Sequence, residues 1–224
     1  MLEQYEARIF NENKELKRSF ELVDSFKKRR TIRNFSKETF DSQIIINAIE
    51  IAGLAPNGAN KQPWNFSLIS DQELKKEIRK KAEEVEYDFY KVRKPKKWIE
   101  DLSHLHTNEK KEFLTDAPYL LPIFCKSCTI ENNESSTNYY VKESVGIATG
   151  FLISALHQSG LSVLTYTPSK IQFIHKLLNK SKNEKLFMLL VIGLPHPEAS
   201  VPVIDKKPIN EILTEYKELS LIHI

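Results

Sequence analysis

The segment from Tyr140 to Ser159 constrains the fold of this chain more than any other. It is apolar over most of its length, and small residues recur along it at Ser144, Gly146, Ala148 and Gly150. A helix that is apolar on nearly all sides is buried rather than amphipathic. We therefore expect a central helix around which the other elements pack.

The other elements alternate irregularly along the chain. Apolar spacing predicts helices over about 11–28, 41–53, 70–90, 108–114 and 172–178, and strands over 64–70, 119–125, 161–165 and 186–193. Asp41 is expected to cap the second helix, and a Ser70-x-x-Glu73 capping box the third. The polar residues 130–138 should form a surface loop. With no internal repeat and no clear linker, 1–224 is expected to be a single α+β domain.

Charge and hydropathy exclude several functions. The 33 basic and 30 acidic residues of the 224 give a net charge of only +3, which does not favour a nucleic-acid partner. No apolar run approaches the roughly 18 residues of a membrane span. Residues 1–30 are charged throughout and lack the apolar core of a signal peptide. We expect a soluble, cytoplasmic protein with no membrane partner.

The only two cysteines, Cys125 and Cys128, have C-x-x-C spacing, which also occurs in redox pairs and in half of a zinc site. Cys125 ends a strand-like run instead of opening a helix, and the chain has no second such pair. Two reduced thiols at a strand end are therefore the preferred interpretation. The six histidines form no paired-ligand pattern, so no metal is expected.

Three arginines lie within five residues, at Arg29, Arg30 and Arg33. The guanidinium group presents a rigid fork of donors that matches phosphate oxygens. In an extended segment the first and third point to one side. A solvated basic turn is the alternative. Neither a dinucleotide G-x-G-x-x-G motif nor a P-loop is present, so the usual nucleotide-binding motifs are excluded.

A second polar segment, from Ala55 to Trp64, combines small residues with amides. Gly58 and Ala59 allow the backbone to approach a flat ligand closely. Asn57 and the nearby amides can donate to and accept from the edge of a heterocycle. By composition alone, an ordinary surface loop is equally consistent with this segment.

Taken together, these two segments resemble the flavin-binding signature of the nitroreductase superfamily. The resemblance continues through Glu143-x-x-Gly146, Thr165 to Pro168, Leu190 to Pro195 and Lys206-Lys207-Pro208. It implies an α+β nitroreductase-like fold, with a mixed sheet flanked by helices and an intertwined homodimer that binds FMN at its interface. The apolar helix would then form the core of the dimer.

The resemblance also implies site residues. Those matching the cofactor-binding positions are Arg29, Arg30, Thr31, Ile32, Arg33, Asn57, Gly58, Thr165, Tyr166, Thr167 and Lys206. A threonine hydroxyl near flavin N5 tunes the cofactor's electronics, and Thr167, then Thr165, are the catalytic candidates. Two of these cofactor-binding positions depart from the pattern, and Asn60 and Gln62 replace residues that vary in the family anyway. Asn57 replaces the usual serine, and Lys206 replaces an arginine and so lacks its bidentate fork.

Residues 86–111 resemble the substrate lid of the iodotyrosine deiodinases within that superfamily. Carried over by position, Glu86, Tyr90 and Lys111 would bind the amino-acid end of a halotyrosine, and the Ala59 backbone N–H its phenolate. One anion and one cation match the two charges of a zwitterion. The expected reaction is reductive dehalogenation of iodo-, bromo- or chlorotyrosine, with electrons from NAD(P)H or an electron-donating reductase.

Two alternatives remain open at this point. One is a general NAD(P)H-dependent nitro- or quinone reductase, in which the lid has no substrate role. The other is a flavin-binding protein without turnover.

Overall fold

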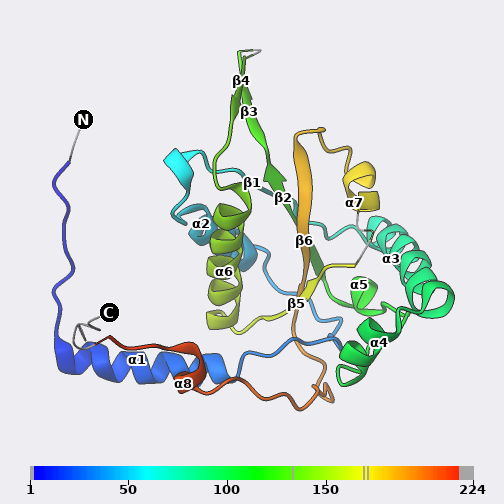
Figure 1. The fold of residues 1–224 in the computed structure, drawn as a ribbon, viewed down its shortest axis with the longest axis horizontal. Helices are drawn as coiled ribbons and strands as arrows, with labels where there is room; N and C mark the ends of the chain where they lie inside the picture. Colours follow the sequence, from blue (N-terminus) through cyan, green and yellow to red (C-terminus); the bar gives the residue numbers. More distant parts are fainter. Residues whose placement is uncertain (1–2, 133, 169, 171, 217–224) are drawn as a thin grey trace, which may run out of the picture.

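The computed structural model describes residues 3–132, 134–168, 170 and 172–216. Its centre is a four-stranded sheet with the order β1-β2-β6-β5 (Figure 1). The strands are β1 (Trp64–Phe66), β2 (Tyr119–Lys126), β5 (Ser162–Tyr166) and β6 (Glu184–Gly193). All three pairings are antiparallel. The four strands therefore form an antiparallel sheet, where a mixed one was expected, and the parallel contact between Thr31 and Val163 is an isolated bridge outside these strand pairings.

Helices cover both faces of this sheet (Figure 1). On one face lie α2 (Gln43–Gly53) and α6 (Val141–Gln158), and on the other α3 (Gln72–Tyr87), α5 (Phe113–Asp116) and α7 (Gln172–Leu177). In the view of Figure 1, α1 (Glu12–Lys27) and α8 (Ile209–Ile212) are both drawn along the lower edge of the molecule. This arrangement confirms the expected α+β class, with a sheet flanked by helices.

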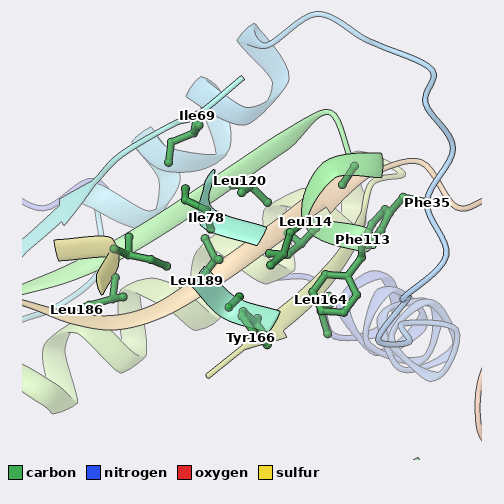
Figure 2. Close-up of a cluster of buried hydrophobic side chains, with 14 of the residues drawn as sticks. Phe35, Ile69, Ile78, Phe113, Leu114, Leu120, Leu164, Tyr166, Leu186 and Leu189 are labelled. Carbon is green, nitrogen blue, oxygen red and sulfur yellow. The ribbon is translucent and has the colours of Figure 1, made fainter. Parts of the chain in front are cut away.

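Two apolar clusters fill the two sides of the sheet. Figure 2 shows the cluster on the α3 side, where Ile78, Leu114, Leu120 and Leu189 converge. The other cluster joins α2 and α6 to the opposite face of the same strands. Because both faces are covered, β2 and β6 appear in the sequence as continuous apolar runs without alternation.

The central helix α6 is only partly buried in the single chain. Ser144, Val145, Ala148, Thr149, Leu152 and Leu156 are buried. On its other face Ile147 is 43% exposed and Phe151 41% exposed, and a Cβ added at Gly146 or Gly150 would meet no neighbour. The expectation of burial on most sides is therefore wrong for one chain, which leaves an apolar stripe uncovered.

Several local predictions need correction. The α3 helix is capped by Asp71, whose carboxylate accepts from the Leu74 N–H at 2.7 Å, and not by Ser70. It ends earlier than expected and continues as a π-helical turn, η2 (Asp88–Arg93). The following helix, α4 (Lys96–Ser103), was not predicted, and it begins directly after Pro95, a residue that favours helix starts. The helix expected over 108–114 overlaps α5 (Phe113–Asp116) only at its last two residues.

Residues 130–138, expected to be a loop, form most of a hairpin, β3 (Cys128–Glu131) and β4 (Glu134–Thr137). The side chains of β4 are exposed, so neither burial nor apolar alternation marked it in the sequence. The two cysteines at its base are free thiols, and burial raises the pKa of Cys125 to about 11. None of the helices in the described part of the chain is long and apolar enough to span a bilayer.

Candidate active site

A cavity of about 390 Å³ opens at the carboxyl end of β5, between that strand and the predicted lid. The lid contributes Glu86, Tyr90 and Lys111 to its wall. The opposite wall is formed by Arg33 and by the segment Thr165–Thr167. The structure therefore brings together all three predicted lid residues with four of the predicted cofactor residues.

Glu86 and Lys111 form a buried ion pair inside this cavity wall. Lys111 Nζ lies 3.2 Å from Glu86 Oε2, and the two residues are only 5% and 8% exposed. The Lys111 ammonium also donates to the Asn108 carbonyl and lies over the Tyr90 ring, 5.4 Å from its centroid. A buried pair of this kind carries a high desolvation cost, so each charge depends on its partner.

The Tyr166 hydroxyl joins the lid to β5. It donates to Glu86 Oε1 at 3.2 Å, so the carboxylate has partners from the lid and from the sheet. Burial, reinforced by the charge of Glu86, raises the pKa of Tyr166 far above its ordinary value. The phenol therefore remains a neutral donor. Tyr166 was predicted as a cofactor-binding residue, and its hydrogen bond to the lid was not predicted.

The lid is held together by aromatic and hydrogen-bonded contacts. The Tyr90 hydroxyl lies 2.8 Å from Thr107 Oγ1, and the rings of Phe89 and Trp98 meet edge to face at 5.0 Å. Burial raises the pKa of Tyr90, with a further contribution from Glu86. All four side chains named here line the cavity, yet only Tyr90 was predicted.

The base of the lid is fixed by Glu83. Its Oε1 accepts from the Lys111 backbone N–H at 2.8 Å and from Arg79 Nε at 2.9 Å. Partial burial acts to raise the pKa of Glu83, but these hydrogen bonds, together with the charges of Arg79 and Lys110, hold the pKa below its usual range. Spacing along α3 gives no signal for this role because the partner lies 28 residues away.

Three groups on the cavity wall have unused hydrogen-bonding capacity. Within the described residues, the side chains of Arg33, Thr165 and Thr167 make no hydrogen bond or ion pair to the protein. Arg33 is half-buried, and burial lowers its pKa, partly offset by Tyr90. Because an unpaired guanidinium is costly to bury, these groups suit a ligand with anionic and polar edges, such as FMN.

The other predicted basic residues lie on neighbouring segments. The Arg30 guanidinium donates to the Pro202 carbonyl and so ties the arginine segment to the C-terminal segment. Lys206 follows four residues later and is exposed. Arg29 and Thr31 are half-buried, and Ile32 packs against the apolar cluster. None of these residues lines the cavity.

The predicted loop residues lie elsewhere, beside α6. The Gly58 N–H points to Ser144 Oγ at 3.5 Å, and a Cβ at Gly58 would come within 3.0 Å of the Tyr139 carbonyl oxygen. The Asn57 amide is used within its own loop, accepting from Gln62 N–H at 2.7 Å and donating to the Ala55 carbonyl. The loop and the cavity therefore occupy different parts of one chain.

Ala59 adopts a left-handed backbone conformation with φ of 51° and is exposed. Such a conformation is strained for a residue with a side chain, and strain of this kind is often stored at ligand sites. A larger hollow of about 1170 Å³ runs along the outer surface of α3, but no predicted site residue lines it. Among the described residues, no group of three or more metal-binding side chains is gathered.

Comparison with known proteins agrees with this geometry. The model of the nitroreductase family matches residues 26–194. A BluB-like flavoprotein from Clostridium difficile 630 superposes with a TM-score of 0.64 at 23% identity, which supports the fold. The match to the family model covers most of the chain, which is therefore a member of the nitroreductase family, a class of flavin-dependent oxidoreductases.

Within this family the chain belongs to the iodotyrosine deiodinases. The iodotyrosine deiodinase of Haliscomenobacter hydrossis is 39% identical over 213 residues, covering 95% of this chain and 96% of that protein. Human iodotyrosine deiodinase 1 is 39% identical over 206 residues, covering 91% and 71%. A crystal structure of oxidized iodotyrosine deiodinase bound to FMN and 3-iodo-L-tyrosine superposes with a TM-score of 0.71 at 35% identity, over 88% of this chain and 99% of that one.

Proposed function

We propose that this protein binds FMN and catalyses the reductive dehalogenation of halotyrosines to tyrosine and halide. The observation that carries the substrate assignment is the buried ion pair between Glu86 and Lys111 at the cavity. A zwitterionic amino acid presents one ammonium and one carboxylate. When it enters, Glu86 takes the ammonium and Lys111 the carboxylate, so that one ion pair is replaced by two. A neutral nitroaromatic or quinone offers no such exchange.

Tyr90 completes this end of the substrate site. Its hydroxyl is held by Thr107, and its ring lies under the Lys111 ammonium, so Tyr90 links the lid cation to the aromatic wall. A lid that is ordered by the substrate also excludes water from the reacting ring. Specificity for an amino acid then depends on polar groups that a wrong substrate would leave unpaired.

The unpaired groups on the cavity wall support FMN as the cofactor. Arg33 offers a fixed fork of donors, with Arg29 and Arg30 on the preceding residues, and Lys206 adds a further cation from the C-terminal segment. Thr165 and Thr167 offer free hydroxyls. Bound FMN, once reduced, supplies the two electrons that, with one proton, replace the carbon–halogen bond by carbon–hydrogen and release halide.

The Ala59 N–H is proposed to bind the phenolate of the substrate, and this requires a second copy of the chain. The loop that carries Ala59 does not line the cavity and packs beside α6. A homodimer in which α6 meets its counterpart would bring the loop of one protomer to the cavity of its partner. Asn57 then acts by holding the loop, and Gly58 by allowing its close packing.

The exposed apolar surface supports such a dimer. α1 buries none of its residues, although it carries several apolar side chains. Large apolar residues are exposed on the N-terminal segment, α1, α6 and the C-terminal segment, namely Tyr5, Ile9, Phe10, Phe20, Leu22, Val23, Ile147, Phe151, Ile209, Ile212 and Leu213. Apolar surface on this scale marks a protein interface.

Bromo- and chlorotyrosine are included as substrates because the proposed contacts involve the amino-acid end and the phenolate. Neither contact depends on the identity of the halogen. The smaller halogens would fit wherever iodine fits. Their stronger bonds to carbon would lower the rate of the reductive step and have less effect on binding affinity.

Anaerobic reduction followed by mixing with substrate tests the proposal. The FMN-loaded protein is reduced with dithionite so that no excess reductant remains. It is then mixed with diiodotyrosine, and both flavin absorbance and released iodide are measured. Reoxidation with stoichiometric iodide release is expected. Reoxidation by nitrobenzene or a quinone alone would instead indicate a general reductase. No reoxidation by either would indicate a flavin-binding protein without turnover.

A further inference from the structure

The segment Lys91–Lys97 carries five basic residues and no acidic one. Subtracting these five from the 33 basic residues leaves 28 against 30 acidic residues. The rest of the chain would thus have a net charge of −2, and the net charge of +3 depends on this one segment. So local an excess of charge sets the electrostatic field around one surface and not around the whole molecule.

This segment lies at the rim of the candidate active site. It runs from η2 into the first turn of α4 and is bracketed by Tyr90 and Trp98, which both line the cavity. In contrast, Lys94, Lys96 and Lys97 are exposed, do not line the cavity and make no ion pair within the described residues. Their charges therefore face outward and do not serve a ligand inside the cavity.

Exposed apolar side chains lie among these charges. Val92 is 65% exposed and Trp98 is 52% exposed. The two remaining cations of the segment are held in place at its edge, Lys91 by Glu109 at 3.5 Å and Arg93 by Asp88 at 2.7 Å. An aromatic anchor with a charged rim is the usual composition of a protein interface.

We propose that this basic surface, formed by Lys91–Lys97 and Trp98, docks an acidic one-electron carrier protein that reduces the bound flavin. The inference rests on the proposed function, because each turnover requires a new supply of electrons. Two reduced carrier molecules each give one electron and become oxidised. Halotyrosine takes up both electrons and one proton, and it yields tyrosine and halide.

The charge distribution favours a protein over NAD(P)H as the direct donor. A nicotinamide nucleotide would place its few phosphate charges inside or at the cavity. The outward-facing cations do not line the cavity, and they flank an exposed Trp98. An acidic protein surface complements this arrangement, and its attraction would speed association and weaken as salt is added.

Reduced flavodoxin, a small acidic one-electron carrier, is the probe. Stopped-flow absorbance measures its second-order rate of reducing the FMN-loaded protein, at about 20 mM and about 300 mM NaCl. We expect the charge reversal K94E/K96E/K97E to lower the rate at low salt by about tenfold or more. At high salt the wild type and the variant should approach the same rate.

The matched control is K176E/K182E/K185E, which makes the same change of charge at exposed positions around α7 and the start of β6, away from the lid. This control should change the rate by less than about twofold at either salt concentration. Reoxidation of each dithionite-reduced variant by diiodotyrosine is measured in parallel. It needs no carrier and therefore tests the proposed function and the folding of each variant separately.

Equal low-salt rates of reduction for the wild type and K94E/K96E/K97E would overturn the docking proposal while leaving the dehalogenase assignment intact. An equal loss of rate in K94E/K96E/K97E and K176E/K182E/K185E would also overturn it, because the loss would then reflect net charge alone. The docking proposal would also be contradicted if NADPH reduced the wild type at least as fast as flavodoxin does and if K94E/K96E/K97E did not change either rate.

Discussion

The two sides of the sheet differ in how their polar groups are satisfied. On the α3 side, Glu86 and Lys111 are buried and paired, and Tyr166 and Glu83 hold them in place. On the α6 side, Ala59 sits in a strained, exposed loop. One side has a cavity with charged walls, and the other has an exposed loop and an uncovered apolar stripe.

This difference fits the proposal that the cavity and the loop form a complete site only across two chains. The Ala59 loop, proposed to bind the phenolate, does not line the cavity of its own chain. A second chain, related by a two-fold axis, would supply each with what it lacks and cover the apolar surface at the same time. The strongest test of this comparison is therefore a mixed dimer of two variants, one with a defective loop and one with a defective lid.

Mixed dimers should regain activity that neither parent has. Ala59→Pro removes the loop N–H and cannot adopt the observed φ, and Lys111→Ala breaks the lid. Each homodimer should lose about 10²-fold or more in halide release. A heterodimer isolated with two affinity tags contains one site with both wild-type parts, so about half of wild-type activity should return.

If both parts of each site came from the same chain, the mixed dimer would be as inactive as its parents. Circular dichroism and FMN content of each homodimer check that both variants fold.

Removing one lid charge should separate substrate binding from cofactor binding. Glu86→Ala or Lys111→Ala deletes the partner of one substrate charge, and halotyrosine affinity should fall about 10- to 100-fold. FMN affinity should change little, because neither side chain is assigned to the flavin. Titrations of flavin fluorescence with diiodotyrosine, and of apoprotein with FMN, measure both. Equal losses of both affinities would contradict the assignment of the lid.

The same pair predicts a pH dependence. Burial lowers the pKa of Lys111, although Glu86 partly offsets this. Lys111 should therefore lose its charge, and its hold on the substrate carboxylate, at a lower pH than an ordinary lysine. Halotyrosine affinity should fall on the alkaline side. Lys111→Arg, which stays charged, should shift the fall to higher pH, and a halotyramine, which has no carboxylate, serves as the control ligand.

Tyr166→Phe tests the link between the sheet and the lid. It removes one hydrogen bond to a buried carboxylate, which contributes about 1.5–3 kcal/mol when the partner is charged. Because Lys111 remains, we expect a smaller loss of halotyrosine affinity than for Glu86→Ala, about three- to tenfold. Tyr119→Phe, which removes a tyrosine hydroxyl that donates to the Phe40 carbonyl away from this cavity, is the matched control. No change for Tyr166→Phe would show that the link is not needed for binding.

Lys206→Arg should have the smallest effect and the opposite sign. An arginine restores the bidentate fork that the family pattern leads us to expect, and FMN affinity should rise about two- to fivefold. Lys207→Arg, at the neighbouring position, is the control. Weaker FMN binding by Lys206→Arg would place this residue away from the phosphate.

Much of the fold was predictable because burial leaves a strong signal in sequence. Long apolar runs marked β2 and β6, and periodic apolar residues marked α2. The misses have local physical causes: β4 is exposed and carries no apolar pattern, Asp71 competed with Ser70 as a cap, and α4 depended on the start provided by Pro95.

The sequence by itself determined the family and the cofactor class, because motifs keep their residue types and order, and it predicted the lid residues. Only the tertiary structure showed that Glu86 and Lys111 pair, that Tyr166 and Glu83 support them, and that the Ala59 loop lies apart from the cavity. These relations join residues up to 80 positions apart in the chain. Spacing along the sequence carries no information about such contacts, since they arise when the sheet brings distant segments together.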